Sequence, residues 1–248
     1  YKGDRNHAFW YFDKEMADAT EKYYANERGK TEQYIGFEQK GKLITFNPKS
    51  HVRMFPSFQP EADGVTFHLK AVYTDTLRNE YSKEHSTHPI RMSRICGPVE
   101  VVNDTTFTVR FYRMGLDNPK RTGGICLMAS VKQDHKYRSA VQQVEIRIPY
   151  RNKEGIPQRI IFPKLSDVKA SVKEISLNGT ADSGLQVYYY VKEGPAEIKG
   201  DKLVLTKIPP RAKFPVKVTV VAWQYGRSGE PKVQTAEAVE QSFYITAR

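Results

Sequence analysis

Long apolar runs, cysteines and the short motifs of common enzymes are all scarce in this chain. No run of about 18 apolar residues occurs, which excludes a transmembrane helix. The sequence contains no G-x-S-x-G nucleophile motif, no P-loop and no dinucleotide-binding glycine fingerprint. We therefore expect no membrane span and no cofactor, and we favour a non-catalytic protein while leaving enzymatic activity open.

Only two cysteines are present, Cys96 and Cys126, and they lack the C-x-x-C spacing typical of a structural zinc site. We accordingly expect no metal centre. Both cysteines lie in apolar, strand-like segments, so two buried free thiols are the favoured interpretation. A disulfide across a β-sandwich is the alternative if the protein is exported.

Acidic residues are outnumbered by basic ones, and the formal net charge is +11. The excess is spread along the chain, with local concentrations at 110–121 and 147–164. A solvated basic surface is the default interpretation, although such surfaces also attract phosphate, sulfate or uronate polymers. No helical or zinc-finger signature of nucleic-acid binding accompanies the charge, so nucleic acid is not the expected partner.

The last third of the chain predicts strands. Between 171 and 246, short runs with alternating side chains are separated by turn residues; Val216, Val218 and Val220, for example, share one face of a strand. A period of two is typical of a strand with one buried face. Strands at this spacing indicate a β-sandwich.

Segment 183–208 reads SGLQVYYYVKEGPAEIKGDKLVLTKI and is followed by a V-V-A strand and a closing Q-F-I strand. It resembles the bacterial immunoglobulin-like modules that occur in strings on secreted and cell-surface proteins. The matching positions are Ser183, Gly184, Leu185, Val187, Tyr189, Val191, Gly194, Pro195, Ala196, Gly200, Leu203, Leu205, Val218, Val220, Ala222, Gln241, Phe243 and Ile245. The chain departs from the pattern at 209–215 and 227–238. The resemblance implies an immunoglobulin-like fold, a spacer or adhesion role, and a secreted, periplasmic or cell-surface location.

The rest of the chain predicts one helix and a second sandwich. Asp13 is a candidate N-cap for a helix over 14–28, which Gly29 would end. A lone helix of this length is marginal in water, so we expect it to dock on the sandwich. Apolar alternation then predicts strands at 41–46, 65–73, 106–114, 124–131, 141–150 and 159–163, with a long irregular insertion at 74–98.

The predicted fold class is therefore mainly β: two β-sandwich domains, the C-terminal one immunoglobulin-like, with one N-terminal helix. The expected divisions are an N-terminal arm and helix (1–36), a β-sandwich domain (37–165) and an immunoglobulin-like domain (166–248).

Aromatic side chains among polar ones are the best candidates for ligand contact. Sugar rings can lie flat on Trp and Tyr while Arg, Asn and Asp bond their hydroxyls. An alternative is that the aromatic rings at 9–12 plug the helix onto the core, and that Trp223 and Tyr225 cover the joint between the domains. The candidate ligand-binding residues are Trp10, Tyr11, Tyr112, Arg113, Asp117, Asn118, Arg121, Trp223 and Tyr225.

Three functions remain open at this point. We favour a non-catalytic, carbohydrate-associated binding or accessory protein of a bacterial secreted or surface system, with a polysaccharide as partner, acidic polymers included, and a larger parent protein. The first alternative is a glycan-active hydrolase whose site lies between the domains or on upstream sequence. The second alternative is a structural spacer or protein-docking module.

Overall fold

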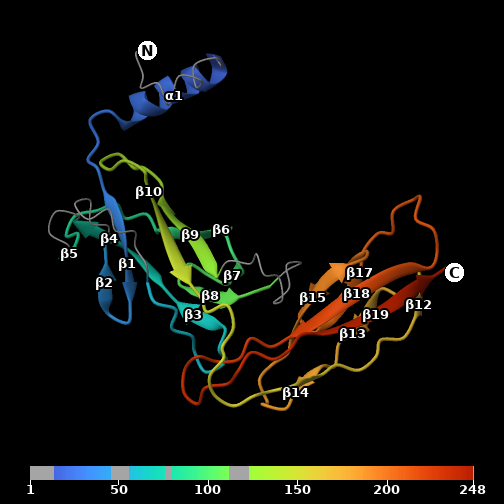
Figure 1. Ribbon diagram of the computed structural model, residues 1–248. Coiled ribbons are helices and arrows are strands. Elements are labelled where there is room, and N and C mark those ends of the chain that lie inside the picture. The colour runs from blue at the N-terminus through green and yellow to red at the C-terminus, as the bar shows by residue number, and fades with distance from the viewer. Residues whose placement is uncertain (1–13, 46–55, 76–79, 112–122, 248) are drawn as a thin grey trace, which may run out of the picture.

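The computed structural model describes residues 14–45, 56–75, 80–111 and 123–247, and in these residues the chain is mainly β. The helix α1 (Lys14–Glu27) precedes two lobes of strands (Figure 1). The predicted helix and its end are confirmed, since Gly29 follows with a φ of 77° that glycine adopts readily. The described part of the chain contains no helix with the length and apolar character that crossing a bilayer requires.

Three antiparallel sheets surround the core of the first lobe. Their strand orders are β2-β1-β4-β5, β3-β8-β7 and β10-β9-β6. The strands are β1 (Tyr34–Gln39), β2 (Lys42–Ile44), β3 (Thr66–His68), β4 (Lys70–Asp75), β5 (Glu80–Tyr81), β6 (Arg91–Cys96), β7 (Val99–Val101), β8 (Thr106–Val109), β9 (Gly124–Val131) and β10 (Ala140–Arg147).

The central strand β9 shows why these sheets share one core. Ile125, Leu127, Ala129 and Val131 are buried, and the residues between them are half-exposed. Strand side chains alternate between faces, so one face of β9 packs inward and the other lies at the surface. Phe37 of β1 and Phe107 of β8 are also fully buried in this cluster.

The chain changes sheets at Leu69, where we expected one continuous strand over 65–73. Val65, Phe67 and Leu69 are buried as predicted, but the next buried residue is Val72, so the period of two is interrupted. β3 pairs with β8 before this point, and β4 pairs with β1 after it. The interruption therefore lets one stretch of chain serve two sheets.

The second lobe has the strand order of an immunoglobulin-like sandwich. One sheet runs β12-β19-β18-β15, the other runs β13-β17-β16, and β11 pairs with β14. This arrangement corresponds to strands C, F and G in one layer and B, E and D in the other. The strands are β11 (Ile160–Ile161), β12 (Val168–Lys169), β13 (Glu174–Ser176), β14 (Thr180–Ala181), β15 (Tyr188–Glu193), β16 (Ala196–Lys199), β17 (Lys202–Leu205), β18 (Val216–Trp223) and β19 (Val239–Thr246).

Strand β18 belongs to the cores of both lobes. Val218, Val220 and Ala222 are buried in the core of the second lobe. Val221 and Trp223, on the opposite face, are buried in the core of the first lobe. A strand covered on both faces carries a nearly continuous apolar run, as VKVTVVAW does. The hydrophobic core is therefore continuous across the joint.

Close backbone packing fixes the same joint. The guanidinium Nη1 of Arg227 donates to the Ala62 carbonyl at 2.8 Å. A Cβ added to Gly64 would lie 2.1 Å from the carbonyl oxygen of Gly226, so only glycine allows this approach. Asn152 Nδ2, on the connection between the lobes, donates to the Tyr225 carbonyl at 2.9 Å.

Two expectations about the first lobe were wrong. The segment 74–98 is not wholly irregular, because it contains β5 and the whole of β6, which pairs with β9. The cysteines are not two buried thiols, since Cys96 is exposed and Cys126 is half-buried. They lie opposite each other on neighbouring strands of one sheet instead of across a sandwich.

The helix α1 exposes its described side chains at 18–22 and 25–26, and only Glu27, at its end, is buried. The expected docking of the helix is therefore limited to its last residue among those described. The division expected at 36/37 falls inside β1, and the one expected at 165/166 falls after β11, whose Ile160 is part of the second core.

Candidate functional site

Two of the candidate ligand-binding residues are buried in the joint between the lobes. Trp223 and Tyr225 have no exposed surface, so neither ring can lie against a ligand. Trp223 packs edge-on against Phe111, with ring centroids 4.8 Å apart, and stacks on Tyr188 at 4.9 Å. Trp223 and Tyr225 therefore cover the joint between the lobes, which was the alternative interpretation from the sequence. The other candidates lie outside the described residues: Trp10, Tyr11, Tyr112, Arg113, Asp117, Asn118 and Arg121.

Two exposed tyrosines lie on the outer face of the β2-β1-β4-β5 sheet. Tyr34 of β1 and Tyr81 of β5 each pair directly with Thr74 of β4, one from either side. Directly paired residues of antiparallel strands point to the same face, and strands are about 4.8 Å apart. The two tyrosines are therefore about 10 Å apart at the backbone. The two residues are 44% and 45% exposed, whereas Thr74 between them is buried.

The same face continues along the strands to Glu38 and Lys70, which also pair directly. Positions separated by an even number share a face, so Glu38 lies on the side of Tyr34, and Lys70 on the side of Thr74. The hydroxyl of Tyr81 donates to Glu38 Oε2. We call the five residues Tyr34, Glu38, Lys70, Thr74 and Tyr81 the tyrosine face.

A groove of about 520 Å³ adjoins the tyrosine face at Glu38 and Lys70. Its walls present carboxylate, amide, imidazole, ammonium and hydroxyl groups, a mixture suited to a ligand rich in hydroxyls. The lining residues are Glu38, Gln39, Lys40, Gly41, Gln59, Pro60, Glu61, His68, Leu69, Lys70 and Thr105.

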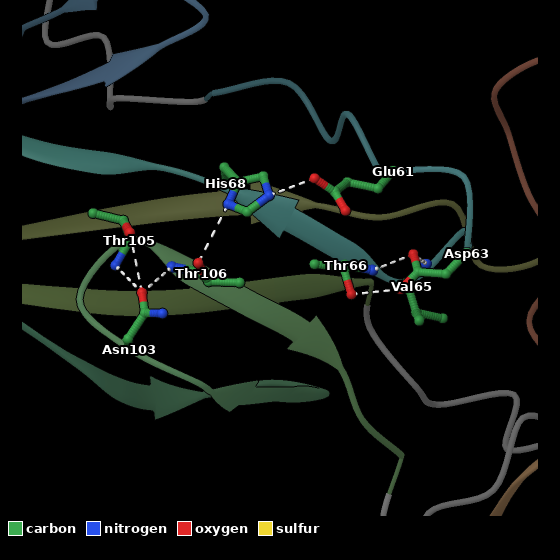
Figure 2. Close-up of polar contacts among 8 residues, drawn as sticks. All are labelled: Glu61, Asp63, Val65, Thr66, His68, Asn103, Thr105 and Thr106. Carbon is green, nitrogen blue, oxygen red and sulfur yellow. Dashed lines mark hydrogen bonds and ion pairs between the residues drawn. The ribbon is translucent and has the colours of Figure 1, made fainter.

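Figure 2 shows how the far wall of this groove is built. His68 Nε2 lies 2.7 Å from Glu61 Oε1, and His68 Nδ1 lies 3.4 Å from the hydroxyl of Thr106. Both His68 and Glu61 are more than half exposed. The side chain of Asn103 accepts from the backbone N–H groups of Thr105 and Thr106, each at 2.9 Å.

A second turn fixes the other end of β3. Asp63 Oδ1 accepts from the backbone N–H of Val65 at 3.0 Å and of Thr66 at 2.8 Å. Aspartate and asparagine side chains form such local bonds readily and stabilise turns. Both ends of the β3–β8 pair are therefore held, and Figure 2 shows the two turns on either side of His68.

The order hydroxyl, imidazole, carboxylate in Thr106, His68 and Glu61 is that of an activated nucleophile. Acyl transfer also needs free N–H donors beside the hydroxyl to stabilise an oxyanion. The N–H groups of Thr105 and Thr106 are both taken by Asn103. The arrangement is thus better suited to hydrogen bonding a ligand than to attacking one.

The phenols of the tyrosine face remain neutral donors near pH 7. The hydrogen bond to Glu38 raises the pKa of Tyr81 above its ordinary value. The hydrogen bond to Glu32 likewise raises the pKa of Tyr34. A carboxylate acceptor disfavours the ionised phenolate, since two negative charges would then be adjacent. Both hydroxyls are accordingly held by carboxylates, while the two residues stay nearly half exposed.

A second groove, of about 420 Å³, lies on the other side of Tyr34. Arg138 Nη1 pairs there with Glu32 Oε1 at 3.2 Å, and Arg28 lines the same groove. Basic groups thus lie at both ends of the tyrosine face, Arg28 and Arg138 at one and Lys70 at the other. Acidic groups accompany them, since Glu27 and Glu32 line this groove and Glu38 and Glu61 line the first.

The described residues contain no group of three or more His, Cys, Asp or Glu side chains placed to hold a metal ion. His85 and His88, which are spaced as His-x-x-His, are exposed in a loop as expected. The ring of His85 stacks on Tyr73 with centroids 4.1 Å apart.

Comparisons with known proteins return only distant structural likenesses. No family model matches the chain, and no curated protein matches it. Human protocadherin-24 EC1-2 aligns with a TM-score of 0.29 at 13% identity, covering 78% of this chain and 94% of that one. Drosophila N-cadherin EC1-4 aligns with a TM-score of 0.28 at 10% identity, covering 78% of this chain and 47% of that one. Mouse cadherin-23 EC22-24 aligns with a TM-score of 0.26 at 18% identity, covering 87% of this chain and 65% of that one. The fold assignment stands on the sheet topology, because likeness at this level carries no argument.

Sequence reasoning missed Tyr34 and Tyr81. Tyr81 follows Asn79 and Glu80 and precedes Ser82 and Lys83, so it is a lone aromatic residue in a polar run. That context is a usable signal of an exposed ring. The alignment of Tyr34 with Tyr81 depends on strand pairing between distant segments, which no local pattern reveals.

Proposed function

We propose that this chain is a non-catalytic, carbohydrate-associated binding or accessory protein of a bacterial secreted or surface system, and that it binds glycan on the tyrosine face. The observation that carries the proposal is the cross-strand row in which Tyr34 and Tyr81 flank Thr74. Two exposed aromatic side chains on one face of a sheet match the apolar C–H faces of sugar rings. Glu38 and Lys70 lie where hydroxyl groups of the same ligand would be bonded.

The net charge of +11 supports an acidic polysaccharide as ligand. An immunoglobulin-like second lobe supports an accessory role, because such modules often serve as spacers beside another activity. A secreted, periplasmic or cell-surface location is part of the same proposal.

A glycan panel that includes neutral and uronate- or sulfate-bearing polymers tests the proposal, with affinities then measured by calorimetry. We expect Tyr34→Ala and Tyr81→Ala each to weaken binding about tenfold, since a ring contact contributes on the order of 1.5 kcal/mol. Tyr244→Ala is the matched control, because Tyr244 is 42% exposed on the second lobe, and it should bind like the unaltered protein.

The outcomes separate the three functions. Binding that is equally strong in Tyr34→Ala, Tyr81→Ala and Tyr244→Ala would remove the tyrosine face from the proposal. Release of reducing ends from any panel member would favour the glycan hydrolase. If no member of the panel binds, the result would favour the spacer or docking module.

A further inference from the structure

The two cysteines occupy directly paired positions on neighbouring strands. Cys96 of β6 lies opposite Cys126 of β9 in the antiparallel register. Directly opposed residues of such strands have Cα atoms about 4.5–5.5 Å apart. That separation lies inside the range of about 4.4–6.8 Å found for disulfide-bonded cysteines. Backbone geometry therefore already brings the two residues within bonding reach.

The end of β6 is held in this position and is not a loose strand terminus. The register shifts between Arg94 and Cys96, which places the last residue of the strand opposite Cys126. The next residue, Gly97, packs on β9 so closely that an added Cβ would lie 2.3 Å from the carbonyl oxygen of Gly124. Arg94 Nε also donates to the Gly97 carbonyl at 3.1 Å.

The two thiols differ in accessibility. Cys96 is exposed, whereas Cys126 is half-buried between Cys96 on one neighbouring strand and Glu145 on the other. Burial, followed by the adjacent Cys96 thiol and the negative charge of Glu145, raises the pKa of Cys126. Thiolate is the reactive form of cysteine, so Cys96 is the better placed to react first.

We propose that Cys96 and Cys126 form a redox-modification site that closes into a cross-strand disulfide. The oxidant is a low-molecular-weight disulfide such as oxidised glutathione. The Cys96 thiolate attacks one sulfur of this disulfide, a mixed disulfide forms, and one glutathione thiolate leaves. Cys126 then loses its proton, and its sulfur attacks the Cys96 sulfur and expels the second glutathione thiolate. The protein loses two hydrogens, and oxidised glutathione becomes two molecules of reduced glutathione.

The product would join the edge strand β6 to the central strand β9 beside the exposed outer face of the sheet. A cross-link between distant parts of a chain stabilises mainly by restricting the unfolded state. For the loop of residues between Cys96 and Cys126, we expect the oxidised protein to melt roughly 5–10 °C above the reduced protein. The inference does not depend on glycan binding.

The test uses the full chain, first reduced and then equilibrated in glutathione buffers of increasing oxidised fraction. We expect loss of both titratable thiols, a mass decrease of two hydrogens, and a cross-linked peptide pair containing Cys96 and Cys126. Cys126→Ser should accumulate a stable glutathione adduct on Cys96. Cys96→Ser should form its adduct on Cys126 at least about tenfold more slowly, because that thiol is less accessible and burial raises its pKa.

Three results would overturn the inference: two thiols that stay titratable in fully oxidised glutathione, cross-links between molecules in place of the internal one, or faster adduct formation at Cys126. Serine is close to cysteine in size, and Cys96 is exposed, so Cys96→Ser should fold. Its melting temperature should not rise in the oxidant, which separates disulfide formation from other effects of the buffer.

Discussion

Replacing Trp223 by alanine should uncouple the two lobes, because this side chain lies where their cores meet. Trp223 is on a strand of the second lobe, yet it is fully buried in the hydrophobic cluster of the first. Its ring contacts Phe111 of the first lobe and Tyr188 of its own lobe. Trp223→Ala therefore leaves a cavity at the joint, with walls contributed by both lobes.

The size of the effect follows from burial and hydrogen bonding. A buried tryptophan removes about 150–250 Å² from water, which at about 25 cal/mol per Å² contributes roughly 4–6 kcal/mol. The indole Nε1 is buried without a hydrogen-bond partner among the described residues, a cost of about 1–3 kcal/mol that alanine relieves. We expect Trp223→Ala to lower the free energy of unfolding by about 3–4 kcal/mol. Trp223→Phe keeps most ring contacts and loses the unpaired N–H, so it should change stability by less than about 1.5 kcal/mol.

Denaturant unfolding followed by circular dichroism measures the loss of stability, and calorimetry shows whether unfolding occurs in one transition or two. The unaltered protein should unfold in one transition, because its core is continuous across the joint. Trp223→Ala should show two transitions as the lobes separate. A loss below about 1 kcal/mol for Trp223→Ala, or a greater loss for Trp223→Phe than for Trp223→Ala, would refute the reasoning.

Two further predictions concern a glycine contact and a carboxylate. Gly64→Ala should lower the free energy of unfolding by about 3 kcal/mol or more, since alanine meets both a positive φ and the Gly226 carbonyl. Gly184→Ala is the control, with a similar φ of 75° and open space around it, and should cost about 1–2 kcal/mol in the same urea titration. The Ser86 hydroxyl and nearby backbone N–H groups lower the pKa of Asp134 from 3.8 to about 2. Ionised Asp134 therefore stabilises the fold above about pH 4, and this contribution is lost as the pH falls towards 2. The melting temperature of Asp134→Asn should be lower than that of the unaltered protein at neutral pH, and it should fall less as the pH is lowered from 4 to 2. An equal fall in both proteins would contradict this.

The second lobe could largely be predicted from sequence because its two longest strands, β18 and β19, alternate clearly and follow one another in the chain. The alternation in 216–223 and 239–246 matches β18 and β19, which pair through most of their length. The burial of Trp223 was the alternative interpretation, and the run VVAW at 220–223, which has no polar residue, favours a strand covered on both sides. What covers the second face could not be inferred, because Phe111 lies more than a hundred positions away.

The first lobe was harder to predict, and the reasons are physical. β6 reads RMSRIC, with only Met92 buried, because an edge strand on the outer part of a sheet needs few apolar residues. The register that brings Cys96 to Cys126, and Tyr34 to Tyr81 across Thr74, arises from pairing between segments far apart in sequence. Long-range pairing leaves no periodic trace in either segment alone.

Stability and binding should be separable in this molecule. The tyrosine face is built by β1, β4 and β5, whereas the joint is built by β18 and the turn at Gly64 (Figure 1). None of the residues of the tyrosine face contributes a ring contact to Trp223. Substitutions further apart than about 10 Å, with no shared partner, act independently. Under conditions where Trp223→Ala remains folded, its glycan affinity should therefore equal that of the unaltered protein, whereas Tyr81→Ala should lose affinity without a matching loss of stability. A parallel loss of affinity in both variants would mean that the second lobe takes part in binding, and that the ligand extends beyond the tyrosine face.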